Sequence, residues 1–287
     1  MMAGKTIEGL RILERFPYFR ACHILDVSDS GERAAIAQWV AERDIALTYC
    51  LTIIMYREEL DLSHRDESKR RQAVARLSEG VREAAECGAV CAQLISGPAP
   101  ALAPDRPANL ALLQRSLTEI AAATADVKGV RLAIEPLDVA FHKRKTLGST
   151  AESIRLTRGV REQQPNFTLC LDTAHMILNE EDPVAMVTEA AGYFDELHLC
   201  NCITQAGHPL YGDYHPNFGP PGRLDAKLAG QVLASACRTG FLSTATPGRV
   251  TGEILRRDQT PEATLQHVQE FLEAAWAAAC DELQLRA

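Results

Sequence analysis

The chain has 287 residues, of which 46% are hydrophobic and 24% are charged. This length exceeds that of an ordinary single domain, but barrels of alternating strands and helices reach it as one unit. The formal net charge of −8 argues against nucleic acid as a partner, because proteins that bind phosphate backbones usually present a positive surface.

The chain contains nine cysteines, several of them inside apolar, strand-like runs such as Leu169-Cys-Leu171. This placement predicts small buried side chains in a reducing compartment and not a framework of disulfides or structural zinc sites. The amino terminus does not resemble a signal peptide, and no apolar run approaches the roughly 20 residues that span a bilayer. We therefore expect a soluble cytoplasmic protein without a membrane partner.

The chain opens in a helix-like segment, Thr6–Arg15, and short β-rich runs then alternate with longer helical patterns. The expected strands are His23–Val27, Ala46–Ile54, Cys91–Ser96, Arg131–Leu137, Thr168–Asp172, Glu196–Asn201 and Val250–Leu255. The expected helices between and after them are Glu32–Arg43, Ser68–Cys87, Ala108–Lys128, Ser149–Gln163, Asp182–Gly192, Asp225–Thr239 and Thr260–Leu283.

Near-continuous apolar strands separated by helices predict parallel strands that are covered on both faces. Seven such units favour an α/β fold of the TIM (β/α)8 type over an open sheet, with residues 1–287 as one barrel domain. A closed barrel needs eight strands, so the first strand is expected to be missing, replaced by another segment or irregular. Trp39 and Trp276 lie on expected helices and are predicted to face the barrel.

Four of the expected strands end in a side chain that can bind a metal ion: Glu135, Asp172, His198 and Glu253. Burying an acidic group at the end of an apolar strand is costly unless a positive charge compensates it, and a divalent cation does so directly. Taken singly, each residue could be solvated, salt-bridged or a satisfied core residue. The ordered set predicts one divalent ion at the mouth of the barrel. Its mostly hard oxygen donors suit Mn²⁺ first, with Mg²⁺, Co²⁺ or Zn²⁺ as alternatives.

The motifs at these strand ends, which include Asp172-Thr-Ala-His175, resemble those of the xylose isomerase-like barrel superfamily. This superfamily contains sugar isomerases, epimerases, dehydratases and metal-dependent abasic-site endonucleases. The resemblance extends from about His23 to the carboxyl terminus. It implies that the four strand-end residues are the metal ligands. In the ketose 3-epimerase branch it further implies that Glu135 and Glu253 act as paired acid and base, and that His175 contacts substrate oxygens.

A second segment, Asp213-Tyr-His215-Pro-Asn217-Phe-Gly219, resembles the loop of the abasic-site endonucleases whose Asp and His bind an additional metal. Those enzymes also need two histidines on earlier strands, and the corresponding stretches here, residues 51–55 and 94–98, contain none. We therefore expect a mononuclear site, with Asp213 and His215 lining a substrate pocket. The alternative is that Asp213 caps a turn and His215 is exposed.

The sequence departs from the ketose 3-epimerases after His198, where those enzymes carry an arginine that holds a substrate hydroxyl. Residues 201–207 contain no arginine, so Arg223, His208 or His215 is expected to take its place. A basic run, His142-Lys143-Arg144-Lys145, follows the strand of Glu135 and predicts a solvated charged segment. The alternative is recognition of a phosphate or carboxylate on the substrate.

The function expected from these features is a metal-dependent sugar isomerase or epimerase that transfers a proton next to the carbonyl of a ketose-like substrate. A lyase or dehydratase acting on a keto-sugar or 3-keto-glycoside is the main alternative, because it would use the same enolate. An abasic-site endonuclease or a non-catalytic barrel subunit ranks below both. The expected partner is a small sugar-like molecule and not nucleic acid, and homo-oligomers occur among relatives.

Overall fold

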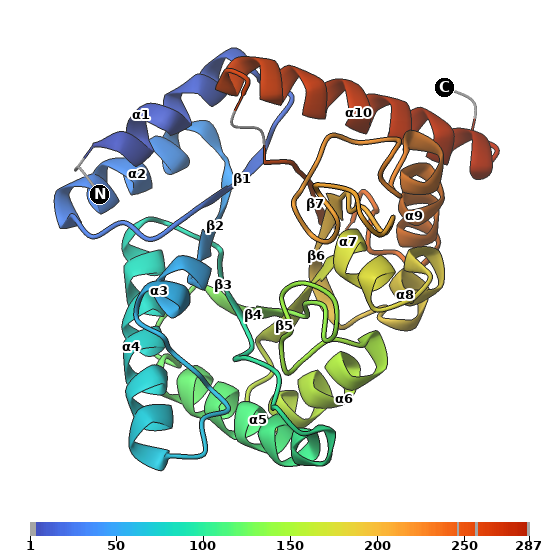
Figure 1. Ribbon diagram of the computed structural model, residues 1–287. Coiled ribbons are helices and arrows are strands. Elements are labelled where there is room, and N and C mark those ends of the chain that lie inside the picture. Colours follow the sequence, from blue (N-terminus) through green and yellow to red (C-terminus); the bar gives the residue numbers. More distant parts are fainter. Residues whose placement is uncertain (1–3, 246, 256–257, 286–287) are drawn as a thin grey trace. The chain divides into compact units, whose positions relative to one another are not determined.

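The computed structural model of the chain describes residues 4–245, 247–255 and 258–285. Strands and helices alternate along almost the whole chain (Figure 1). The strands are β1 (Ala21–Ile24), β2 (Ala46–Cys50), β3 (Cys91–Ile95), β4 (Arg131–Glu135), β5 (Phe167–Asp172), β6 (Phe194–Cys200) and β7 (Arg249–Glu253). The helices are α1 (Lys5–Arg11), α2 (Ser30–Arg43), α3 (Thr52–Arg57), α4 (Glu67–Glu86), α5 (Arg106–Ala123), α6 (Thr150–Arg161), α7 (Thr173–Leu178), α8 (Pro183–Glu189), α9 (Ala226–Arg238) and α10 (Pro261–Glu282), with 3-10 turns η1 (Ile12–Arg15) and η2 (Ala103–Asp105).

The chain divides into two compact units, and the first comprises residues 1–135 and 155–168. Within it, β1 to β4 pair in chain order and all run parallel. All five residues of β3 are buried, as is typical of a parallel strand covered on both faces. Helices α4 and α5 pack against each other, and the buried Arg70 of α4 bonds to Ser116 and Glu119 of α5.

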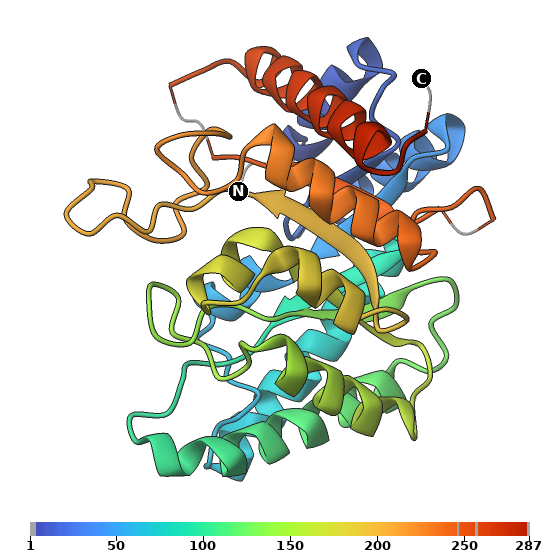
Figure 2. The same ribbon diagram turned by 90° about the vertical axis from the view of Figure 1, so that its right-hand side faces the viewer.

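The second unit comprises residues 136–154 and 169–287 and contains most of the candidate functional residues. Within it, β5, β6 and β7 pair in chain order and run parallel. Helices α9 and α10 lie side by side (Figure 2). Gly230 of α9 allows this approach, because a Cβ there would lie 2.6 Å from the Cβ of Ala278 in α10.

The predicted strands are confirmed, with ends that shift by up to a few residues, and so are the main helices. The prediction of one strand over Ala46–Ile54 is wrong beyond Cys50, because α3 begins at Thr52. Its apolar side chains fit a buried strand and a buried helix equally well, so the pattern alone could not place the boundary. Over the described ranges the strands number seven, and α1 with η1 precedes the first of them.

All nine cysteines are free; five are buried, as predicted, and four are half-buried. Trp39 is buried, but the prediction for Trp276 is wrong, since 47% of this residue is exposed on α10. Among the described residues, no helix is long and apolar enough to cross a membrane.

Candidate functional site

The register of three parallel strands in the second unit brings three of the predicted metal ligands together. Asp172 at the end of β5 lies opposite His198 in β6, and His198 lies opposite Thr251 in β7. Glu253 follows Thr251 by two residues and therefore shares its face of the sheet, because side chains alternate along a strand. The three candidate metal ligands thus project from one face at the carboxyl ends of their strands.

The distances within this group fit a single small cation. Nδ1 of His198 lies 3.1 Å from Oε2 of Glu253 and 3.9 Å from Oδ2 of Asp172. One ligand atom from each of the three residues lies within 4.8 Å of the others. Donors that each lie about 2.1 Å from one divalent ion are at most about 4.2 Å apart, so the pairs at 3.1 and 3.9 Å satisfy this limit. Two carboxylates and one imidazole are an appropriate donor set for such an ion.

Asp172 also fixes the start of the short helix α7, which the sequence analysis did not predict. Its Oδ1 accepts hydrogen bonds from the backbone N–H groups of Ala174 and His175, at 2.6 and 3.1 Å. This is an N-cap, in which a side-chain oxygen satisfies free N–H groups at the start of a helix. One carboxylate oxygen therefore caps α7, and the other faces His198.

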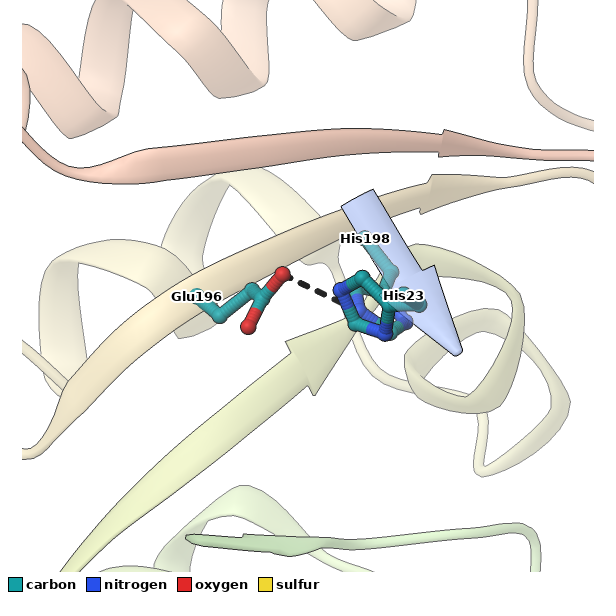
Figure 3. A group of neighbouring side chains, drawn as sticks. All are labelled: His23, Glu196 and His198. Carbon is teal, nitrogen blue, oxygen red and sulfur yellow. Dashed lines mark ion pairs between the residues drawn. The ribbon is translucent and has the colours of Figure 1, made fainter. Parts of the chain in front are cut away.

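The other ring nitrogen of His198 faces a buried carboxylate from the same strand. Oε1 of Glu196 lies 3.8 Å from Nε2 of His198, and Figure 3 shows this ion pair between the two side chains. Glu196 also accepts a hydrogen bond from Thr251 Oγ1 at 3.1 Å and lies 3.5 Å from Arg249 Nε. Glu196 was expected only as a strand residue; its position two residues before His198, on the same face, was the available signal.

Glu135 belongs to the first unit and is the last residue of β4. It is buried and accepts a hydrogen bond from Nε2 of Gln93 at 2.8 Å. Gln93 lies on the neighbouring strand β3. The position of Glu135 at a strand end agrees with the sequence pattern, and its role as a ligand and base stays a prediction.

Asp213 and His215 lie in the loop between β6 and α9 and contact each other. Nε2 of His215 lies 3.2 Å from Oδ2 of Asp213, and Nδ1 lies 3.3 Å from Oε1 of Glu253. Asp213 is buried and His215 is largely so, which means that the alternative of a turn cap beside an exposed histidine is wrong. Nε2 of His175 lies 3.8 Å from the same Oδ2 of Asp213, so the loop joins the other predicted substrate residue.

Ionisation in this cluster follows from burial and from the neighbouring charges. Burial disfavours the charged form of His215, but the hydrogen bond to Asp213 and the charges of Glu253 and Asp213 outweigh it and raise the pKa of His215 to about 9. Burial also disfavours ionised Asp213, yet His175, His215 and Lys143 hold its pKa well below the usual value. The cluster therefore contains an anionic Asp213 paired with a cationic imidazole.

Asp138, three residues after Glu135, is a further member of the site that the sequence analysis missed. It is fully buried, and its Oδ1 lies 3.5 Å from Nδ1 of His175. Its Oδ2 accepts hydrogen bonds from the backbone N–H groups of His142 and Lys143, at 2.5 and 2.8 Å. His175 is thus held between two carboxylates, Asp138 at Nδ1 and Asp213 at Nε2.

The basic run that was predicted to be solvated takes part in this network. Nζ of Lys143 lies 3.1 Å from Oδ2 of Asp213, and Nδ1 of His142 accepts a hydrogen bond from the Asp213 N–H at 3.0 Å. Lys145 is buried, and within the run only Arg144 is exposed. The prediction of a solvated segment is therefore wrong, because the run joins its loop to the loop of Asp213.

Arg223 lies at the end of the same loop. The residue is exposed, and its backbone N–H donates to the carbonyl of Cys202 at 3.0 Å. Asn201 holds this part of the loop, since its Nδ2 donates to the carbonyls of Asn217 and Gly219 and its Oδ1 accepts from the Leu224 N–H. The role of Arg223 in binding substrate stays a prediction.

Comparison with known proteins identifies the family and the fold. Residues 9–275 match the family model described as a xylose isomerase-like TIM barrel. No curated protein sequence matches the chain.

Three solved structures illustrate the likeness. An L-ribulose 3-epimerase is 17% identical with a TM-score of 0.72, and the match covers 99% of this chain and 93% of that one. The D-psicose 3-epimerase from Clostridium cellulolyticum H10, solved with D-tagatose, is 15% identical with a TM-score of 0.69, covering 100% and 95%. The IolI protein with a bound zinc atom is 13% identical with a TM-score of 0.72, covering 96% and 93%.

At these identities the structural likeness shows the fold alone, and this fold is the TIM barrel that the sequence pattern predicts. The family match spans nearly the whole chain, as does each of the three structural matches. The chain therefore belongs to the xylose isomerase-like TIM barrel family.

Proposed function

We propose that the protein is a metal-dependent sugar isomerase or epimerase that moves a proton on the carbon next to a carbonyl group. The observation that carries this proposal is the cluster of Asp172, His198 and Glu253, in which His198 Nδ1 lies 3.9 Å from one carboxylate and 3.1 Å from the other. The cluster combines ligands for a cation with a carboxylate that can act as a base. That pairing is what enolisation of a sugar requires.

The proposed ligands are these three residues together with Glu135, which ends the preceding strand β4. Mn²⁺ is the ion we propose, with Mg²⁺, Co²⁺ and Zn²⁺ as alternatives, because three carboxylates and one imidazole are mostly hard donors. A bound cation would supply Lewis acidity that polarises the substrate carbonyl. The zinc-containing IolI structure supports a metal in this fold but does not identify the ion used here.

Glu253 and Glu135 are the proposed acid and base. One carboxylate removes the proton from the carbon next to the carbonyl, and the other returns a proton from the opposite face, which inverts that carbon. Return to the neighbouring carbon gives isomerisation. His175 and Asp213 are proposed to bind substrate hydroxyl groups, and Asp138 fixes the imidazole of His175 through its Nδ1, 3.5 Å from Oδ1.

The proposed substrate is a small ketose-like sugar. The epimerase names of two structural neighbours support this class. Residues 201–207, which follow the strand of His198, contain no arginine, so the hydroxyl held by arginine in the ketose 3-epimerases must be held differently here. Arg223 and His208 are the proposed substitutes. This difference leads us to propose the reaction class and not one particular sugar.

The experiment that tests the proposal is proton exchange with solvent. The protein is loaded with Mn²⁺, its metal content is measured, and it is incubated in D₂O with a panel of ketoses and 3-keto-glycosides. Deuterium on the carbon next to the carbonyl, detected by NMR, is the expected result. The absence of exchange with every compound while Mn²⁺ is bound would overturn the proposal, as would cleavage of abasic DNA.

A matched pair of variants identifies the base. Glu253→Gln should lower kcat by about 10²–10⁴-fold at saturating metal, while KM changes by a few-fold at most, because the amide cannot accept the proton. Glu189→Gln, an exposed residue of α8, is the control and should retain wild-type rates. Full activity of Glu253→Gln would remove Glu253 from the mechanism. Formation of an unsaturated keto-sugar with loss of a substituent would instead assign elimination, the lyase alternative.

A further inference from the structure

His215 is held in place by its backbone as well as by its side chain. The residue has a φ of 48°, in the left-handed region that residues other than glycine seldom adopt. Its carbonyl accepts a hydrogen bond from the N–H of Leu255 at 2.8 Å. Leu255 lies just beyond the end of β7, two residues after Glu253. The backbone of the loop is thus tied to the strand that carries Glu253.

Two groups fix the imidazole ring of His215. Oδ2 of Asp213 lies 3.2 Å from Nε2, and Sγ of Cys200 lies 2.9 Å from Nδ1. Cys200 lies opposite Glu253 in the pairing of β6 with β7, so its thiol reaches the ring from the neighbouring strand. Asp213 is itself fixed, because Lys143 lies 3.1 Å from its Oδ2. The ring therefore has little freedom to rotate.

The fixed ring presents Nδ1 to one oxygen of Glu253. Nδ1 of His215 lies 3.3 Å from Oε1, while Nδ1 of His198 lies 3.1 Å from Oε2. The two oxygens of the carboxylate thus face two different imidazole rings, although the Glu253 side chain is 39% exposed. A half-exposed glutamate has several rotamers available, and the contact of Oε1 with the fixed ring of His215 favours one of them.

We propose that His215 is a positioning residue that orients the carboxylate of Glu253, so that Oε2 faces His198 and the ligand cluster. The inference rests on the proposed function, because it assigns His215 a role through Glu253 and not through direct contact with substrate. It differs from the sequence-based expectation, in which His215 lines the substrate pocket. Groups that orient metal ligands in this way commonly change metal affinity or activity by about 10–100-fold when they are removed.

Three substitutions at His215 separate the side-chain contact from the strained backbone. In His215→Asn the amide nitrogen can occupy the position of Nδ1, and asparagine tolerates the left-handed region. In His215→Gln the longer amide reaches toward Asp213 and leaves Glu253 without this contact. In His215→Gly the backbone is relaxed and the contact is lost, so any defect of this variant is not due to strain.

Crystal structures of the metal-free variants provide the first readout. Glu253 should keep its wild-type rotamer in His215→Asn and should change it in His215→Gln and His215→Gly. An unchanged Glu253 in His215→Gly would overturn the inference. This readout does not depend on any activity, so it stands even if the wild-type protein fails the exchange experiment and the proposed function is lost.

Kinetics and metal binding provide the second readout. In His215→Gln and His215→Gly we expect kcat or Mn²⁺ affinity to fall by about 10–100-fold, with KM for the sugar within about twofold of wild type. His215→Asn should recover most of the loss. A raised KM with unchanged kcat in His215→Gly would return His215 to substrate binding and overturn the positioning role. Equal defects in His215→Asn and His215→Gly would overturn it as well.

Discussion

Oε1 of Glu196 lies 3.8 Å from Nε2 of His198, on the opposite side of the ring from the Nδ1 that faces Asp172 and Glu253. At this distance the contact is electrostatic and is too long for a hydrogen bond. A carboxylate beside Nε2 favours the tautomer that carries its proton there. That tautomer leaves the lone pair of Nδ1 available to a cation.

Replacing this carboxylate should weaken metal binding without removing a ligand. We expect Glu196→Gln to lower the affinity for Mn²⁺ by about tenfold, the lower end of the range for groups that orient metal ligands, because the contact is long. Isothermal titration calorimetry measures this change. Glu189→Gln, a charge-matched substitution on the exposed face of α8, is the control. An affinity for Mn²⁺ equal to wild type in Glu196→Gln would show that the charge does not act on His198.

Asp138 should make stability depend on pH in the acid range. Burial disfavours its ionised form, but the nearby imidazole of His175 and the hydrogen bonds from the backbone N–H groups of His142 and Lys143 outweigh burial and lower the pKa of Asp138. A group with a lower pKa in the folded state adds stability above its unfolded pKa, about 4, and this stability is lost as the pH falls through the folded pKa. Its contribution is therefore complete at neutral pH.

Urea unfolding of Asp138→Asn at several pH values tests this expectation. The variant should be less stable than wild type by about 1–3 kcal/mol at pH 7, because a buried charged acceptor is lost, and the difference should shrink below about pH 4. Asp182→Asn is the control, since asparagine caps α8 as well as aspartate does. A difference that stays constant down to strongly acidic pH would contradict the role of ionised Asp138.

Arg70 and Arg71 offer a matched pair for the stability of the first unit. Arg70 is fully buried and donates hydrogen bonds to Glu67, Ser116 and Glu119, joining α4 to α5. Arg71 pairs with Glu67 but its side chain is 69% exposed. Arg70→Met should lower the free energy of unfolding by about 2–3 kcal/mol, and Arg71→Met by at most about 0.5 kcal/mol. If chemical denaturation gives similar losses of unfolding free energy for both variants, the burial of Arg70 adds nothing to stability.

The chain order of strands and helices was predictable because each element carries its own periodic pattern. Continuous apolar runs such as Phe167–Asp172 indicate a strand buried on both faces, and longer amphipathic segments indicate helices. The candidate ligands were predictable for the same local reason. An acidic residue or a histidine at the end of such a run is conspicuous, as with Asp172, His198 and Glu253.

The boundary errors have an equally local cause. Thr52–Arg57 forms a helix directly after β2, although its side chains continue the apolar run of the strand. Nothing in the spacing of such a short run distinguishes a buried strand from a buried helix. The exposed position of Trp276 was missed because a helical pattern gives the faces of a helix but not what packs against each of them.

The network around the candidate ligands was decided by tertiary structure. Asp138, Asp213 and His215 lie in loops, where no periodic pattern indicates which way a side chain points, and Asp138 is separated from Asp213 by 75 positions in the chain. Their contacts with His175 and Glu253 depend on strand register and on bonds between loops, such as the ion pair of Lys143 with Asp213. The sequence by itself thus determined which elements form and which strand ends carry candidate ligands. The tertiary structure alone determined what orients them, because orientation arises from contacts between residues distant in the chain.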